Sequence, residues 1–126
     1  MYDIEELWLF LPLGYCLTIF FEIPVLLVGL AKVHSLRERL IAGFGLTAFT
    51  YPVVVLVLPL IFAQQPTTFM IVAEIFAPLA ECWLFALLFH TARVSKPDRL
   101  RNYAAIVVAN LVSFGCGELL KLAGWL

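Results

Sequence analysis

Hydrophobic residues in this chain run in four long blocks rather than on one face of shorter segments. The blocks predict helices near residues 8–31, 40–63, 67–91 and 102–124. Each block reaches the about 20 residues that a helix needs to cross the hydrocarbon core of a bilayer. Backbone groups in lipid must be paired within the protein, and a helix achieves this within one segment. The pattern therefore predicts an all-α integral membrane protein: a single domain, residues 1–126, with four transmembrane helices.

Charged residues are few and unevenly placed, which predicts how the helices cross the membrane. The chain is 63% hydrophobic and 13% charged, and its formal net charge is −1, so no nucleic-acid surface is indicated. All lysines and arginines except Lys121 lie in two segments, 32–39 and 91–101, whereas the middle connection, 63–66, is uncharged. By the positive-inside rule, both basic loops are expected in the cytoplasm and both termini outside. We expect a bacterial-type inner membrane or an organellar membrane.

The two halves of the chain resemble each other, which suggests two tandem helical hairpins. Matching residues recur about 60 positions apart, and the same pattern could arise because short basic loops resemble each other whenever they serve the same topology. A true duplication predicts a pseudo-twofold axis along the membrane normal, with polar sites near the midplane where the halves meet. The matched pairs are Ser35 and Ser95, Arg39 and Arg99, Thr50 and Asn110, and Glu22 and Glu81.

Several polar residues inside the hydrophobic blocks are candidates for a cation-binding or proton-binding site. A charge at the bilayer centre costs roughly 2.5 to 3.5 kcal/mol on insertion scales, so such residues usually face the bundle interior, a water path or a partner. Counted from the outer helix ends, one group lies about twelve to fourteen residues deep and shares a layer near the midplane, and a second group lies nearer the outside. The deep group is Glu22, Glu81, Asn110 and Tyr51, and the shallower group is Glu74 and Glu118.

Small residues and prolines near these acids permit both structural and functional readings. Four-residue stripes such as Gly43, Thr47 and Tyr51 let membrane helices pack closely, so they serve as packing seams as well as polar linings. Pro52 and other interior prolines remove backbone donors and bend helices, which either relieves packing or frees carbonyls for a cation. Glu118 stands three residues before Lys121, so a local ion pair competes with a role in the site.

The two histidines are the remaining residues that could bind a cofactor. His34 and His90 both lie near the cytoplasmic ends of their helices. A metal or haem at His34 or His90 is conceivable, but neither belongs to a motif with metal-ligand spacing, so no cofactor is predicted and the identity of any metal stays unknown. The three cysteines form no CxxC pair, which gives no sign of redox chemistry.

These observations favour a small membrane protein that moves a cation or small solute, with proton coupling through the midplane glutamates. Its expected surroundings are the lipid bilayer and either further copies of itself or a membrane-protein partner, because four helices enclose little space. Two other classes stay open. A noncatalytic subunit or assembly factor of a larger membrane complex would use the acids to pair with basic residues of a partner. An intramembrane enzyme would use Glu22, Glu81 and His90 as acid, base or metal ligands.

Overall fold

The computed structural model describes the backbone of residues 4–124 and the side chains of residues 12–124. Over that range the chain is all-helical, and four helical segments are long and apolar enough to cross a membrane. The elements in chain order are α1 (Ile4–Gly29), α2 (Leu36–Pro52), a π-helical segment η1 (Val53–Val57), α3 (Leu58–Ile61), α4 (Pro66–Phe89) and α5 (Lys96–Leu122). The segments α2, η1 and α3 follow one another without a break and together form the second long rod.

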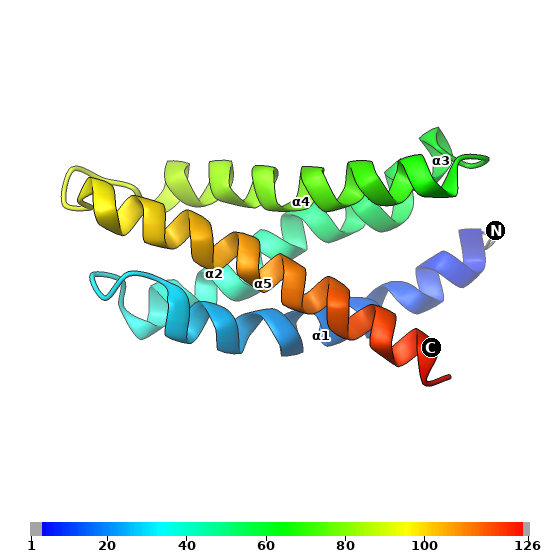
Figure 1. Ribbon diagram of the computed structural model, residues 1–126, viewed down its shortest axis with the longest axis horizontal. Coiled ribbons are helices and arrows are strands. Elements are labelled where there is room, and N and C mark those ends of the chain that lie inside the picture. Colours follow the sequence, from blue (N-terminus) through cyan, green and yellow to red (C-terminus); the bar gives the residue numbers. More distant parts are fainter. Residues whose placement is uncertain (1–3, 125–126) are drawn as a thin grey trace.

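The four rods run antiparallel to their neighbours in sequence (Figure 1). Helix α1 packs against α2 and α5, and α4 also packs against α2 and α5, so α1 and α4 lie diagonally opposite each other. Both basic connections, 30–35 and 90–95, lie at one end of the bundle, which we call the basic-loop end. The connection 62–65, the start of α1 and the end of α5 lie at the opposite end, the terminal end.

The basic segments are more helical than the hydrophobic pattern predicts, and this is a correction. We expected the second and fourth helices to begin at residues 40 and 102, but α2 begins at Leu36 and α5 at Lys96. Ser35 and Ser95 are the N-caps, since their hydroxyl oxygens accept hydrogen bonds from the backbone N–H groups three residues later, at 3.1 and 3.3 Å. A serine followed three residues later by an acid is a helix-start signal that a search for apolar runs overlooks.

Two arginines fold back over the preceding connections and fix their shape in the same way. Arg39 donates from Nε to the carbonyl of His34 at 3.0 Å and from Nη2 to that of Ala31 at 2.9 Å. Arg99 donates from Nε to the carbonyl of Val94 at 3.1 Å and from Nη2 to that of Thr91 at 2.9 Å. These bonds tie each arginine to two carbonyls of the connection that precedes its helix, and the carbonyls of Ala31 and Thr91 also accept a backbone N–H.

The prolines affect the helices unequally. Helices α1 and α4 continue through Pro24 and Pro78, whereas Pro52 is followed directly by η1. In η1 the N–H of Leu58 bonds to the carbonyl of Val53, five residues earlier, as in a π-helix. Pro52 has no N–H, so the carbonyl of Ala48 receives no α-helical bond from it directly before this wider turn.

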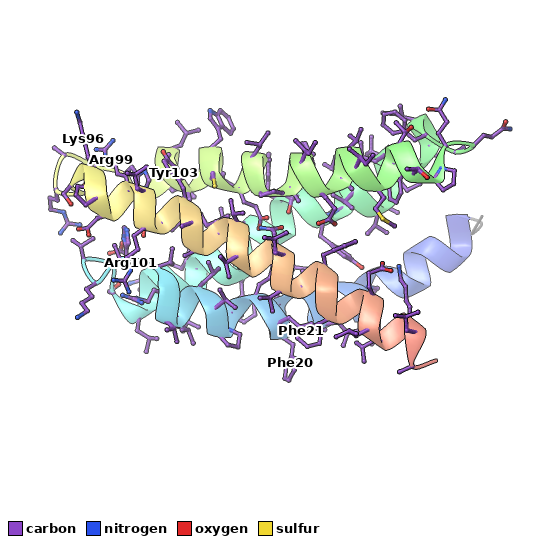
Figure 2. All side chains as sticks on the ribbon, in the orientation of Figure 1. Phe20, Phe21, Lys96, Arg99, Arg101 and Tyr103 are labelled. Atoms are coloured by element: carbon purple, nitrogen blue, oxygen red, sulfur yellow. The ribbon has the colours of Figure 1, made fainter. Side chains whose placement is uncertain are left out.

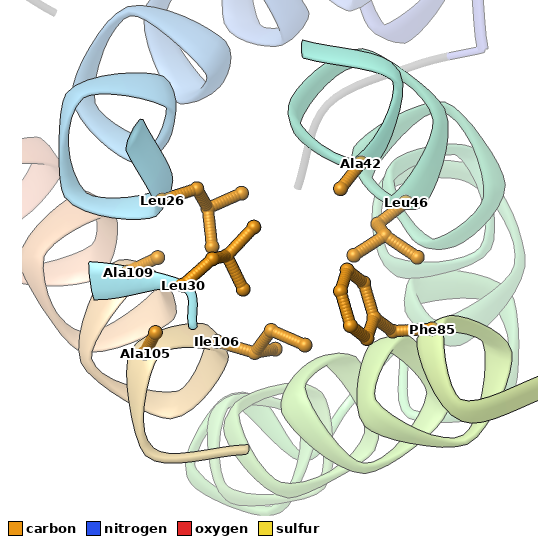
Figure 3. Close-up of a cluster of buried hydrophobic side chains, with 8 residues drawn as sticks. All are labelled: Leu26, Leu30, Ala42, Leu46, Phe85, Ala105, Ile106 and Ala109. Atoms are coloured by element: carbon orange, nitrogen blue, oxygen red, sulfur yellow. The ribbon is translucent and has the colours of Figure 1, made fainter. Parts of the chain in front are cut away.

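The hydrophobic core occupies the half of the bundle nearer the basic-loop end. Its buried members come from all four rods and meet on the bundle axis (Figure 3). Of residues 12–124, only Gly14, Thr50, Leu58 and Ala73 are buried in the halves of their rods nearer the terminal end. The core residues are Leu26, Leu30, Ala42, Leu46, Phe85, Ala105, Ile106 and Ala109.

The outer faces of the bundle are apolar along most of their length. Phe20 is 71% exposed and projects away from the bundle, and large aliphatic side chains are exposed on every rod. Figure 2 shows Lys96, Arg99 and Arg101 gathered at the basic-loop end, near Tyr103. An apolar exterior with charges confined to the ends is the surface that a lipid bilayer solvates well.

Candidate functional site

A cavity of about 140 Å³ lies between all four rods, where the tightly packed half of the bundle ends. Its wall combines carboxyl, hydroxyl and amide groups with small aliphatic and aromatic side chains, and it includes no lysine, arginine or histidine. A cavity of this size has room for water, since about 10 to 15 Å³ of such space holds one water molecule. The lining residues are Thr18, Glu22, Thr47, Thr50, Tyr51, Val54, Ala73, Glu74, Ala77, Asn110, Ser113 and Phe114.

Glu22 is the most buried acid that lines the cavity, with 3% of its surface exposed. Its Oε2 accepts a hydrogen bond of 2.7 Å from the Thr47 hydroxyl, which joins α1 to α2. The carboxyl also lies within electrostatic reach of Glu74 and Glu81. The structure thus brings Glu22 together with two other acids that the sequence singled out.

Glu81 lies next to this group but does not line the cavity itself. It is 3% exposed, and its Oε2 is buried without a hydrogen-bond partner among the described residues. Asn110 lies beside the Glu81 carboxyl, and its Nδ2 donates to the carbonyl of Ile106 at 2.9 Å. A buried carboxyl oxygen that lacks a donor is costly, so this group needs a proton, a cation or a movement of its neighbours.

Tyr51 and Glu74 complete the cluster from the terminal side. Tyr51 lines the cavity at the end of α2, directly before Pro52 and η1, and its hydroxyl is buried without a partner in the described part of the chain. Its ring packs at a tilt against Tyr15, with 6.2 Å between the ring centroids. Glu74 is half-buried in the cavity wall.

Glu118 is separate from the other candidates. Its Oε1 accepts a hydrogen bond of 3.3 Å from Nζ of Lys121, and the side chains of Lys121 and Glu118 are 59% and 39% exposed. It does not line the cavity, although its charge reaches Glu74. The local ion pair that the spacing permitted is therefore present, and five of the six candidates lie in or beside the cavity.

The small-residue stripes serve both purposes that the sequence allowed. Near the basic-loop end they are packing seams, since a Cβ added at Gly43 would lie 2.6 Å from Ile23 and one added at Gly29 would lie 2.9 Å from Cβ of Ala105. Nearer the terminal end the same stripes line the cavity, with Thr47 and Ser113.

Hydroxyl residues also line the cavity, although the sequence pattern placed them on small-residue stripes and not among the site residues. Thr18, Thr47, Thr50 and Ser113 supply hydroxyl groups to the wall. Thr18 lies four residues before Glu22, Thr47 four residues before Tyr51, and Ser113 three residues after Asn110. This spacing was the available signal, because residues three or four apart share a helix face.

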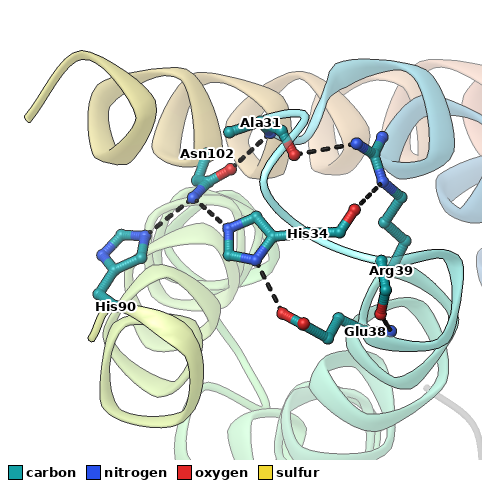
Figure 4. A network of polar contacts seen from close by, with 7 residues as sticks. Ala31, His34, Glu38, Arg39, His90 and Asn102 are labelled. Carbon is teal, nitrogen blue, oxygen red and sulfur yellow. Dashed lines mark hydrogen bonds and ion pairs between the residues drawn. The ribbon is translucent and has the colours of Figure 1, made fainter. Parts of the chain in front are cut away.

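A second polar cluster lies at the basic-loop end, and we call His34, His90 and Asn102 the loop-end cluster (Figure 4). Asn102 is completely buried, and its Nδ2 lies 2.9 Å from Nε2 of His34 and 3.0 Å from Nε2 of His90. Its Oδ1 accepts a hydrogen bond of 2.8 Å from the N–H of Ala31, and Nδ1 of His34 lies 2.9 Å from Oε2 of Glu38. Sequence reasoning noted both histidines but not Asn102, which joins them.

The geometry of this cluster disfavours a metal ion or a haem at the two histidines. Both Nε2 atoms are directed at the Asn102 amide, so a metal ion there would have to displace that amide. Among the described residues, no three side chains of the histidine, cysteine, aspartate and glutamate types are grouped as a metal site requires. Burial, with Arg99 and His34 as further causes, lowers the pKa of His90 below its ordinary value.

Comparisons with protein-family models, with curated proteins and with solved structures found no match to this chain. A fold does not define a function by itself, so the function has to be argued from the geometry of the site. The central cavity and its carboxyl groups are the features from which that argument starts.

Proposed function

We propose that the protein crosses a membrane with its four helical rods and moves a cation or small solute through the central cavity, with protons exchanging at Glu22 and Glu81. The observation that carries this proposal is the cavity itself. Its wall contains the carboxyl groups of Glu22 and Glu74 and no basic residue, and Glu81 lies beside it. A negative charge in a low-dielectric site requires compensation by a proton or a cation. Replacement of one by the other is the elementary step of proton-coupled transport.

The chemistry of the wall suits a small cation that keeps part of its hydration or carries a short apolar portion. Glu22 and Glu74 supply negative charge, while Thr18, Thr47 and Ser113 supply hydroxyl oxygens. Val54, Ala73, Ala77 and Phe114 supply the apolar part of the wall. Oxygen ligands of this kind bind hard cations and ammonium groups.

The packing of the bundle supports access from the terminal end. Buried residues concentrate between the cavity and the basic-loop end, so that route is filled by side chains. With both basic loops on the cytoplasmic side, as the positive-inside rule predicts, the cavity would be reached from outside.

An internal duplication fits the same proposal. The bonds of Ser35 and Arg39 recur at Ser95 and Arg99, always 60 residues later. One bond within the helices recurs at the same offset of 60 residues. The Thr50 hydroxyl donates to the carbonyl of Leu46, and Nδ2 of Asn110 donates to the carbonyl of Ile106. A twofold relation between the halves would exchange α1 with α4 and α2 with α5, which are the diagonal pairs of the bundle. Transporters with repeats place their sites where the halves meet.

The two other classes have less support from the geometry. A partner's basic residue would have to reach Glu22 or Glu81, and each of these is 97% covered by its own chain. An intramembrane enzyme that combines Glu81 with His90 would need the two side chains together, whereas His90 bonds to Asn102 at the basic-loop end. Assembly into a homo-oligomer, or with another membrane protein, is compatible with each class.

Cation binding across pH tests the proposal directly. Purified protein in lipid nanodiscs would be titrated by calorimetry with sodium, potassium and a set of small ammonium ions, in buffers of different ionisation enthalpy. We expect binding to release protons and to be lost in Glu22→Gln and Glu81→Gln. Glu118→Gln is the matched control, because its ion pair lies outside the cavity.

Flux into proteoliposomes then distinguishes transport from binding alone. We expect uptake of the bound cation to depend on a proton gradient in wild type and in Glu118→Gln, and to stop in Glu22→Gln. A folded protein that binds none of these cations at any pH would refute the transport proposal and favour a subunit of a larger complex.

A further inference from the structure

The hydrogen atoms of the loop-end cluster can be counted, and the count fixes which atoms carry them. The N–H of Ala31 requires an acceptor, so the oxygen of the Asn102 amide must face it. The two hydrogens of the amide nitrogen then point at Nε2 of His34 and Nε2 of His90. Both Nε2 atoms must therefore be unprotonated acceptors, and both neutral rings carry their hydrogen on Nδ1.

Protonation of either ring is incompatible with this arrangement. A histidinium ion donates from both nitrogens, so its Nε2–H would point at an N–H of Asn102 across about 3 Å. Rotating the amide by half a turn does not help, because its nitrogen would then face the N–H of Ala31. The protonated ring has to leave Asn102, and a completely buried amide loses a bond that it cannot replace with water.

The charged and titratable groups around the cluster come from α2, from α5 and from the connection 90–95. From α2, Glu38 contacts His34, and Arg39 donates to its carbonyl. From α5, Arg99 acts electrostatically on His90, and the Tyr103 ring lies edge-on to it at 5.1 Å. From the connection 90–95, Arg93 acts electrostatically on Glu38. Helix α4 contributes only the aromatic rings of Phe85 and Phe89, and the connection 30–35 contributes the Ala31 backbone.

The two histidine rings differ in the groups that lie next to Nδ1. His34 is accompanied by the Glu38 carboxylate, whereas Nδ1 of His90 is buried without a partner in the described chain. Burial and the positive charge of Arg99 keep the pKa of His90 low, so this ring stays neutral at physiological pH. His90 is therefore an acceptor for the Asn102 amide under neutral conditions.

We propose that the loop-end cluster is a proton-controlled contact, which holds the basic-loop end of the bundle closed when both histidines are neutral and releases it when one is protonated. The contact joins three separate parts of the chain: the connection between α1 and α2 through Ala31 and His34, the C-cap of α4 through His90, and the second turn of α5 through Asn102. Its loss frees α4 from α1 and α5 at that end.

This inference stands on the cluster alone, and one consequence rests on the proposed function. If the central cavity carries a cation, release of the loop-end cluster would open the route between the cavity and the basic-loop end. The tests below use no cation and measure no flux, so their failure and a failure of the transport proposal are distinguishable.

Nitrogen NMR of the histidine rings tests the count of hydrogens. The chain contains only two histidines, so ¹⁵N-labelled histidine in lipid bilayers gives two assignable rings, identified through His34→Gln and His90→Gln. At pH 7.5 we expect both rings to be neutral, with protonated Nδ1 and unprotonated Nε2. Either ring protonated at Nε2 at this pH would overturn the proposal.

The separation of the two basic loops tests the mechanical consequence. Spin labels at Lys32→Cys and Ala92→Cys, in a chain whose Cys16, Cys82 and Cys116 are replaced by alanine, report the distance between the ends of α1 and α4. We expect this distance to lengthen and its distribution to broaden when the pH falls below the histidine range. The double variant His34→Gln/His90→Gln keeps carbonyl acceptors for Asn102 and cannot titrate, so its distance is expected to be independent of pH. An unchanged distance in the wild-type histidine background, or the same change in the double variant, would overturn the proposal.

Discussion

Individual side chains in this protein owe their roles to hydrogen-bond partners in other helices. Glu22 and Glu118 are both glutamates within hydrophobic segments, yet one bonds to Thr47 inside the bundle and the other pairs with Lys121 near the surface. Asn102 and Asn110 stand on the same helix, but Asn102 bonds to three residues of other elements, whereas Nδ2 of Asn110 bonds to its own helix. Chemical type alone therefore does not set the role.

The two asparagines of α5 provide a matched test of the loop-end cluster. We expect Asn102→Ala to lower the free energy of unfolding by roughly 2 to 4 kcal/mol, because buried donors and acceptors lose their partners. Asn110→Ala is expected to cost less than about 1 kcal/mol, since its amide is half-buried and bonds to a carbonyl of its own helix. Urea unfolding in detergent micelles measures both, and equal losses would show that the cluster does not stabilise the bundle.

The two buried threonines of α2 provide a similar test of the cavity. Thr47→Val removes the hydroxyl that donates to Glu22 and preserves the shape of the side chain. We expect cation binding to weaken about tenfold, since a hydrogen bond to a charged group is worth about 1.5 kcal/mol or more. Thr50→Val is the control, because the Thr50 hydroxyl donates to the carbonyl of Leu46. Calorimetry measures both constants, and equal effects would argue against a role of Thr47 through Glu22.

The lowered pKa of His90 predicts how stability depends on pH. The unfolded chain binds a proton at His90 near the ordinary value of about 6.5, whereas the folded chain does so only at lower pH. The unfolded state therefore holds more protons in this interval, and stability falls as the pH drops through it. His90→Gln is expected to remove this part of the profile, which thermal unfolding between pH 8 and 5 measures. An unchanged acid slope in the variant would contradict the assignment.

At the scale of elements, the helices are fixed by their caps and by close contacts between small residues. Ser35 and Ser95 start α2 and α5 inside the basic segments, so these helices begin before the apolar runs that predicted them. Gly29 lets α1 approach α5 at Ala105, and Gly43 lets α2 approach α1 at Ile23. Membrane helices associate mainly through such packing, because lipid offers no hydrophobic driving force between them.

Two glycines distinguish a packing seam from an open helix face. Gly29→Ala is expected to destabilise the bundle by about 1 to 3 kcal/mol, because the new Cβ would lie 2.9 Å from Cβ of Ala105, which is fixed to the α5 backbone. Gly45→Ala meets no atom within 4 Å and is expected to be neutral or stabilising by up to about 1 kcal/mol. Thermal unfolding of the two variants checks both signs. Equal stability would mean that α1 and α5 can separate at no cost.

At the scale of the whole molecule, the even number of rods places both termini and the uncharged connection at one end. The basic connections lie at the other end, as expected for a chain oriented by its positive residues. The diagonal relation of α1 to α4 and of α2 to α5 is the arrangement that a duplicated hairpin would adopt.

Cysteine labelling tests the orientation of the whole chain. In a variant without native cysteines, we expect Lys32→Cys and Ala92→Cys to react with a membrane-impermeant maleimide only after the cytoplasmic side is opened. Gln64→Cys, in the connection between α3 and α4, is expected to react in intact cells, and all three positions are exposed. Reaction of all three from the same side would contradict a four-span topology.

Sequence patterns predicted those features of the structure that depend on residues close together in the chain. The four long apolar rods follow from the hydrophobic runs, because continuous apolar segments of this length pair their backbone groups within a helix. The starts of α2 and α5 were placed too late, since a capping serine among charged residues does not change an average of hydrophobicity. The signal was present in the order of Ser35 and Glu38, and of Ser95 and Asp98.

The sequence by itself determined the helical class, the number of long rods and the residues that carry charge within them. Only the tertiary structure decided which of these residues meet. Glu22 meets Thr47 and lies near Glu81, and Asn102 joins two histidines more than fifty residues apart in the chain. The reason is that periodicity and depth place a residue along its own helix, whereas the rotation of each helix and its neighbours follow from packing across the whole bundle.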